Sequence, residues 1–144
     1  MVGKRRIYVA SSWRNPYQPD IVRSLRMHGH EVYDFRNPAP GQNGFQWSEI
    51  DPKWRDWGLE YYRDALYHPI ARHGFANDYA AMDWADTCVL ALPSGRSAHI
   101  EAGWMKGTGK DLFILMMEPQ EPELMYKLAN DVFGSIADLT GALR

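Results

Sequence analysis

The chain has 144 residues, which suits one domain with a substantial core. Its content of 45% hydrophobic and 24% charged residues excludes disordered and collagen-like classes. The net charge of −2 argues against binding to a nucleic acid polymer, but it leaves room for one phosphate in a local pocket. No run approaches the ~20 apolar residues that cross a bilayer, and no secretory leader is recognisable. The single cysteine, Cys88, fits a reducing compartment, so we expect a cytoplasmic protein.

Apolar runs of strand length alternate with helix-like segments along the chain. In chain order we expect a strand at 6–10, a helix at 16–28, a strand at 31–35, a loop at 36–58, helices at 59–66 and 75–84, a strand at 87–92, a helix at 97–106, a strand at 112–116, a helix at 121–130, and then a short strand and a terminal helix. This alternation predicts a three-layer α/β domain over 1–144, flavodoxin-like or Rossmann-like, with a parallel sheet of about five strands. Ligands of such sheets bind beyond the carboxyl ends of the strands, which directs attention to the loops after Ala10, Phe35, Leu92 and Met116.

The loop after the first expected strand carries polar side chains just before a helix. It contains Ser11, Ser12, Trp13 and Arg14 and lacks the glycines of a dinucleotide fingerprint or a phosphate-binding Walker loop. Two hydroxyls and a guanidinium at a helix N-terminus favour an anion such as phosphate. The alternative is that Ser12 or Asn15 only caps the helix.

Glu101 lies near the start of the helix expected at 97–106. Its neighbours three and four positions away are mostly apolar: Ser97, Ala98, Trp104 and Met105. A solvated surface glutamate usually has polar company, and Ala98 rules out a capping box. Glu101 is therefore either a functional carboxylate or a residue that interacts favourably with the helix dipole.

Asp78 is expected near the start of the helix at 75–84. It is either a helix cap or a carboxylate partner for Glu101, since glycosidic chemistry uses a pair of carboxyl groups and Asn77 can cap instead. The five histidines show no metal-like spacing, so we expect no metal site, and His99 is interpreted as a polar surface residue. An aromatic cluster in the long loop either covers the core or forms a lid over a base; its members are Phe45, Trp47, Trp54, Trp57, Tyr61 and Tyr62.

These residues together resemble the nucleoside 2-deoxyribosyltransferase family, and within it the branch of deoxynucleoside 5′-monophosphate N-glycosidases. Three segments carry the resemblance: the opening segment from Tyr8 to Arg14, Asp78 eight residues before Asp86, and the segment from Ile100 to Gly103 that is followed by Gly107–Lys110. The resemblance implies that Glu101 is the nucleophile, that Asp78 contacts the sugar and the leaving base, and that Ser12 and Arg14 hold the phosphate.

The sequence departs from the family pattern around the proposed nucleophile. Gly95 stands where transferases carry an aspartate, which favours hydrolysis over transfer. Arg96, Ser97 and His99 replace a glycine-rich turn, and Arg96 either adds a phosphate contact or narrows the pocket. The family also takes a polar residue from a neighbouring subunit, for which the candidates here are Met125, Tyr126 and Asn130.

The resemblance thus implies an enzyme that releases a free base from a nucleoside or nucleotide without a cofactor, as a homodimer or higher oligomer. The substrate-binding residues that we expect are Tyr8, Ser11, Ser12, Trp13, Arg14, Gly95, Arg96 and Ser97. Two alternatives remain at this point, a nucleotide-binding module that senses its ligand without turnover and a glycohydrolase that acts on NAD.

Overall fold

The computed structural model describes residues 3–143. Its contacts divide the chain into two compact units, one formed by the residues up to Asp34 and from Met82 onward, the other by Phe35–Ala81. Within residues 3–143 no helix combines the length and the apolar character that a membrane span requires.

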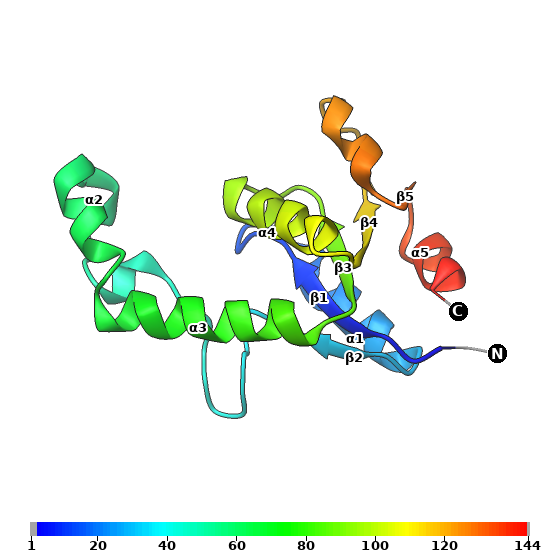
Figure 1. The fold of residues 1–144 in the computed structure, drawn as a ribbon, viewed down its shortest axis with the longest axis horizontal. Coiled ribbons are helices and arrows are strands. Elements are labelled where there is room, and N and C mark those ends of the chain that lie inside the picture. The colour runs from blue at the N-terminus through cyan, green and yellow to red at the C-terminus, as the bar shows by residue number, and fades with distance from the viewer. Residues whose placement is uncertain (1–2, 144) are drawn as a thin grey trace. The chain divides into compact units, whose positions relative to one another are not determined.

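The first unit contains a five-stranded, all-parallel sheet in the order β2-β1-β3-β4-β5 (Figure 1). Its elements are β1 (Arg6–Ala10), α1 (Gln18–Met27), β2 (Glu31–Tyr33), β3 (Thr87–Ala91), α4 (Arg96–Gly107), β4 (Asp111–Leu115), the 3₁₀ helix η3 (Leu124–Leu128), β5 (Asp131–Phe133) and α5 (Ile136–Ala142). This confirms the predicted α/β class and the number of strands. The order is that of a doubly wound flavodoxin-like sheet.

Side chains of the central strands alternate between two apolar layers, as the pleat requires. One layer packs α1 and α5 against the odd-numbered strand residues, among them Ile7, Val89 and Leu115. The even-numbered residues, such as Tyr8 and Cys88, therefore point to the opposite face, where α4 packs on β1, β3 and β4. Both faces are covered, which explains why β3 is buried along its whole length.

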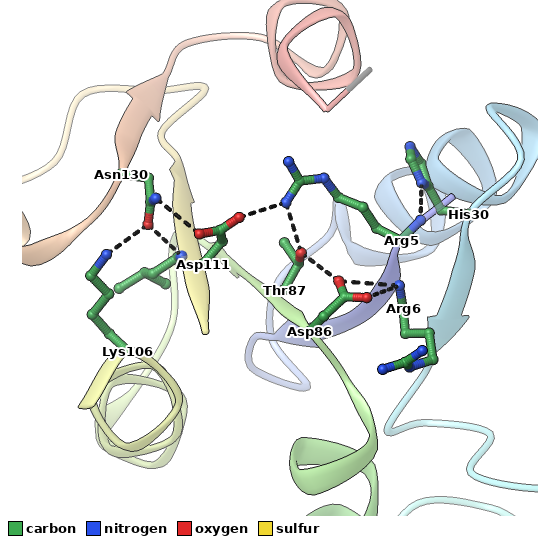
Figure 2. Close-up of polar contacts among 9 residues, drawn as sticks. Arg5, Arg6, His30, Asp86, Thr87, Lys106, Asp111 and Asn130 are labelled. Atoms are coloured by element: carbon green, nitrogen blue, oxygen red, sulfur yellow. Dashed lines mark hydrogen bonds and ion pairs between the residues drawn. The ribbon is translucent and has the colours of Figure 1, made fainter. Parts of the chain in front are cut away.

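Polar contacts join the amino ends of the strands (Figure 2). The Arg5 guanidinium donates to Thr87 Oγ1 at 3.0 Å and to Asp111 Oδ2 at 2.8 Å. Asn130 Nδ2 donates to Asp111 Oδ1 at 3.1 Å, and Lys106 Nζ donates to Asn130 Oδ1 at 2.9 Å. These bonds tie β1, β3, β4 and the start of β5 together at the edge opposite to the one where ligands of such sheets bind.

The buried His30 next to this network makes the stability of the fold sensitive to pH. Arg5 N donates to His30 Nδ1 at 3.0 Å, so this nitrogen carries no proton in the native state. Burial, and secondarily the charge of Arg5, lower the pKa of His30 below its usual 6.5. The unfolded chain therefore binds a proton more readily than the native one, and the contribution of His30 to stability is complete above pH 6.5 and falls as the pH drops below it.

Urea unfolding between pH 5 and pH 8 checks this prediction. The wild type should lose stability toward pH 5, and His30→Asn should lose less, because an amide oxygen accepts the Arg5 N–H without titrating. The nearby His28 and Asp86 are present in both proteins and cancel in the difference. Identical slopes for the two proteins would contradict the assignment.

The second unit is built from short helices and a cluster of aromatic side chains. Its elements are the 3₁₀ helices η1 (Trp47–Glu49) and η2 (Trp54–Asp56), the helix α2 (Leu59–Ala65), and α3 (Pro69–Trp84), whose last three residues belong to the first unit. Ring pairs with centroids 4.8–6.0 Å apart connect Phe45, Trp47, Trp57, Tyr61 and Tyr62. Trp54 contacts the guanidinium of Arg55 at 4.3 Å. Five of the six aromatic residues predicted to cluster are thus joined by ring contacts.

Two predicted helices differ from the structure. Helix α3 begins at Pro69 and not at residue 75, because Pro69 suits a first helical position and His68 Nδ1 accepts the Ile70 N–H at 3.1 Å. Asp78 is therefore well inside the helix, so the prediction that it starts the helix is wrong. In the segment predicted as a helix over 121–130, only η3 forms, and Pro122 precedes it.

Candidate functional site

Tyr8 and Glu101 meet on the face of the sheet that α4 covers. Tyr8 is 1% exposed on β1, and its ring stacks on Tyr33 of β2 with centroids 5.5 Å apart. Glu101 projects from the first half of α4, and the Tyr8 hydroxyl donates a hydrogen bond to Glu101 Oε2. A charge-assisted bond from a buried phenol fixes the direction of the carboxylate. A favourable interaction of Glu101 with the helix dipole does not by itself account for this hydrogen bond to Tyr8.

Cys88 lies beside this pair, because Tyr8 and Cys88 are partners in the β1–β3 register. Its thiol is fully buried. Burial raises the pKa of Cys88 far above its usual range, and the negative charge of Glu101 raises it further. A thiol held protonated in this way is no nucleophile. The structure therefore supports the interpretation of Cys88 as a packing residue.

The loop after β1 is held against β3 by its own side chains. Ser11 Oγ and Asn15 Nδ2 each donate to the Ala91 carbonyl at 3.1 Å. Ser12 Oγ accepts the Arg14 N–H at 3.1 Å, so Ser12 stabilises the loop and does not cap α1. Trp13 is 40% exposed, and Arg14 is exposed as well. The loop is thus preorganised, with an indole and a guanidinium at its surface.

The turn from β3 into α4 presents backbone amides without a side-chain cap. Gly95 is the N-cap residue in an extended conformation, and Arg96 and Ser97 are exposed in the first turn. A Cβ at Gly95 would meet no atom within 4 Å, so space does not require glycine there. The buried Ser94 Oγ has no hydrogen-bond partner among the described residues. Unpaired amides at a helix N-terminus favour a bound anion.

His99 has a role that the sequence did not suggest. Its Nδ1 lies 2.7 Å from the Gly95 carbonyl, and its Nε2 lies 2.8 Å from the hydroxyl of Tyr126 in η3. His99 is thus a half-buried polar residue that makes two specific contacts. Its position four residues after the N-cap Gly95 could have predicted the first contact, but the second joins residues 27 positions apart and has no local signal.

Asp78 belongs to the second unit, on α3, whereas all other predicted site residues belong to the first. On the helix it shares a face with Ala71 and Ala81, which are both buried. Its neighbour Asn77 contacts His73 Nε2 at 3.4 Å and does not cap a helix. Asp78 therefore does not cap the start of a helix, and its pairing with Glu101 stays a prediction.

Metal-ligating side chains do not gather anywhere in the part of the chain that the structure describes: no group of three His, Cys, Asp or Glu residues could hold an ion. The candidate site consists of three parts: the Glu101 carboxylate with Tyr8 as its donor, the polar loop after β1, and the N-terminus of α4 after β3. The loop and the helix N-terminus follow the carboxyl ends of β1 and β3, and the Tyr8–Glu101 pair lies on the face of the sheet that α4 covers.

This architecture is a doubly wound α/β fold with a carboxylate site at the centre of the sheet. No family model and no curated protein matches the sequence. Solved structures share the fold. A 2-deoxyribosyltransferase from Bacillus psychrosaccharolyticus is 19% identical, with 93% of this chain and 89% of that chain covered and a TM-score of 0.62. The CMP N-glycosidase of Clostridium botulinum is 16% identical, with 96% and 98% covered and a TM-score of 0.53.

Proposed function

We propose that this protein is an enzyme that cleaves the N-glycosidic bond of a nucleoside 5′-monophosphate or a nucleoside, with ribose or deoxyribose as the sugar, and releases the free base. The observation that carries the proposal is the hydrogen bond between Tyr8 and Glu101, which holds a carboxylate on the face of the sheet that α4 covers. The fold is shared with a 2-deoxyribosyltransferase and with a CMP N-glycosidase, which supports the class of reaction.

In the proposed mechanism Glu101 is the nucleophile. Its carboxylate attacks the anomeric carbon through an oxocarbenium-like transition state, and the bonding electrons leave with the base. Asp78 donates a proton to the departing base nitrogen. Water then attacks the same carbon and frees both the sugar and Glu101, and the proton that it releases to solvent balances the one that returns Asp78 to its acid form. Hydrolysis is favoured over transfer because Gly95 stands where transferases carry an aspartate.

The 5′-phosphate is assigned to the polar loop and the α4 turn. Ser12 and Arg14 lie in the first, and the amides of Arg96 and Ser97 open the second. Trp13 is 40% exposed and is assigned to packing against the base, and Ser11 supports the loop through its bond to Ala91. No cofactor takes part in this scheme.

An assay of free base release tests the proposal. Purified protein is incubated with a panel of nucleosides, their 5′-monophosphates and NAD, with and without an acceptor base, and an acid-quenched sample is peptide-mapped. Release of base with a pentosyl adduct on the Glu101 peptide supports the proposal. Nicotinamide release restricted to NAD supports the glycohydrolase alternative. Thermal stabilisation by a nucleotide without any base release supports a sensing module and contradicts the proposal.

Tyr8→Phe is expected to slow base release by about tenfold to a hundredfold, because a hydrogen bond to a charged group contributes about 1.5–3 kcal/mol. The ring and its stacking on Tyr33 remain, so the melting temperature should change little. Tyr17→Phe is the matched control, since the Tyr17 hydroxyl donates to the Glu118 carboxylate at 2.8 Å. Equal rates for the two variants would show that the bond to Glu101 does not assist the reaction.

We also propose that the protein forms a homodimer or a higher oligomer. Large apolar side chains of α4 and η3 are exposed in the single chain: Ile100 is 72% exposed and Leu124 81%. Scattered apolar residues are normal on a surface, but these two lie in elements joined by the His99–Tyr126 contact. Light scattering of the purified protein measures the state directly, and a monomer at working concentration would contradict this.

A further inference from the structure

His99 and Tyr126 form a contact between the start of α4 and the segment after β4. Their rings stack with centroids 5.7 Å apart and an angle of 18° between the planes. His99 Nε2 and the Tyr126 hydroxyl are 2.8 Å apart. Burial, together with the charge of Glu123, raises the pKa of the Tyr126 hydroxyl, so the hydroxyl keeps its proton near neutral pH.

The Gly95 carbonyl determines which imidazole nitrogen carries the proton. A carbonyl only accepts hydrogen bonds, and it lies 2.7 Å from His99 Nδ1, so Nδ1 donates. In the neutral ring Nε2 is then the acceptor for the Tyr126 hydroxyl. The two bonds therefore run in one direction, from Tyr126 through His99 to Gly95, and each depends on the orientation of the same ring.

The Gly95 carbonyl belongs to the peptide plane that also contains the Arg96 N–H. Because this unit is planar, a bond that holds the carbonyl also fixes the direction of the first free amide of α4. The helical bond to the same carbonyl, from the His99 N–H, is long at 3.4 Å, and no side chain caps the helix. The imidazole is thus the closer restraint on this amide.

The segment that carries Tyr126 depends on the same contact. None of the side chains of η3 is buried, and Leu124, Met125 and Leu128 are at least half exposed. The core therefore does not hold η3 in place. The bond to His99 fastens it to the N-terminal half of α4, and η3 in turn holds the imidazole ring.

We propose that His99 and Tyr126 are positioning residues that orient the first turn of α4 for the 5′-phosphate of the substrate, an inference that rests on the proposed function. Neither side chain takes part in the cleavage itself. Their contribution is to the selection of a monophosphate over the corresponding nucleoside.

The decisive variant is Tyr126→Phe, which keeps the stacked ring and removes the hydroxyl. We expect the KM for the monophosphate to rise about fivefold to tenfold, the size of one hydrogen bond, while its kcat and both constants for the nucleoside stay within about twofold. His99→Phe should raise the same KM at least as much, and adding Tyr126→Phe to it should have no further effect. Tyr17→Phe, which removes a tyrosine hydroxyl that donates to Glu118 and not to His99, is the control.

A second measurement does not require turnover. The Arg96 amide signal in a ¹H–¹⁵N spectrum is followed while inorganic phosphate is added, and we expect a response in the wild type that needs about fivefold more phosphate in Tyr126→Phe. If the wild type released no base, only the proposed function would be contradicted. This titration would still test the inference about His99 and Tyr126. The inference would be overturned if the Arg96 amide signal of the wild type did not respond to phosphate, or if Tyr126→Phe gave the same titration as the wild type. An equal rise of KM for the nucleoside and the monophosphate in Tyr126→Phe would also overturn it.

Discussion

Replacing Glu101 by Gln is expected to lower the rate of base release by about 10³-fold or more, the usual loss when a covalent nucleophile is removed. The amide has nearly the shape of the carboxylate and can still accept the hydrogen bond from Tyr8, so the fold should persist. It cannot form a stable ester with the anomeric carbon. The measurement is free base over time, together with a mass spectrum of the acid-quenched protein.

The control for this substitution is Glu31→Gln, which also neutralises one glutamate of the first unit. Glu31 begins β2 at the amino edge of the sheet and is 3.9 Å from Lys4 Nζ. It should release base like the wild type and show the same adduct. If Glu101→Gln matched the wild-type rate, Glu101 would not be the nucleophile, whatever the fold resembles.

Asp78→Asn is expected to slow base release by about 10²-fold or more, the usual contribution of a general acid. The loss should be large for ordinary bases, whose nitrogen must be protonated as the bond breaks. It should shrink toward the wild-type rate for a 7-methylguanine nucleotide, since that base departs without needing a proton. The comparison of the two substrates distinguishes a proton donor from a residue that only supports the fold.

Asp83→Asn provides the control on the same helix. Asp83 is five residues further along α3, exposed, and on another face of the helix. It should behave like the wild type with both substrates. An equal loss with both substrates in Asp78→Asn would show that Asp78 supports binding or folding and does not protonate the base.

The fold was largely predictable because strand and helix periods are local properties of the chain. The strand at 6–10 and the start of the strand at 87 agree with β1 and β3. The errors are also local. The pattern predicts a helix from residue 75, whereas Pro69 starts α3 and puts Asp78 inside it. It also predicts a full helix over 121–130, where Pro122 lies near the start and only η3 forms.

The candidate site was predictable in part, for a reason that concerns distance along the chain. Glu101 stood out because its apolar company on α4 is set by helical spacing within a few residues. Its bond to Tyr8 joins positions 93 apart, and the bond from Tyr126 to His99 spans 27. Neither leaves a trace in local composition, so the sequence could not assign these partners.

The sequence alone determined the class of fold and the edge of the sheet at which to look, because hydrophobic periods and the rules of parallel crossovers suffice for both. Only the tertiary structure decided what the side chains do there. It showed that Tyr8 donates to Glu101, that Ser11 and Asn15 both bind the Ala91 carbonyl, and that His99 connects Gly95 to Tyr126. The physical reason is that a hydrogen bond requires its donor and acceptor to be placed to within a few tenths of an ångström, and only the folded chain brings the strands and helices that carry them together.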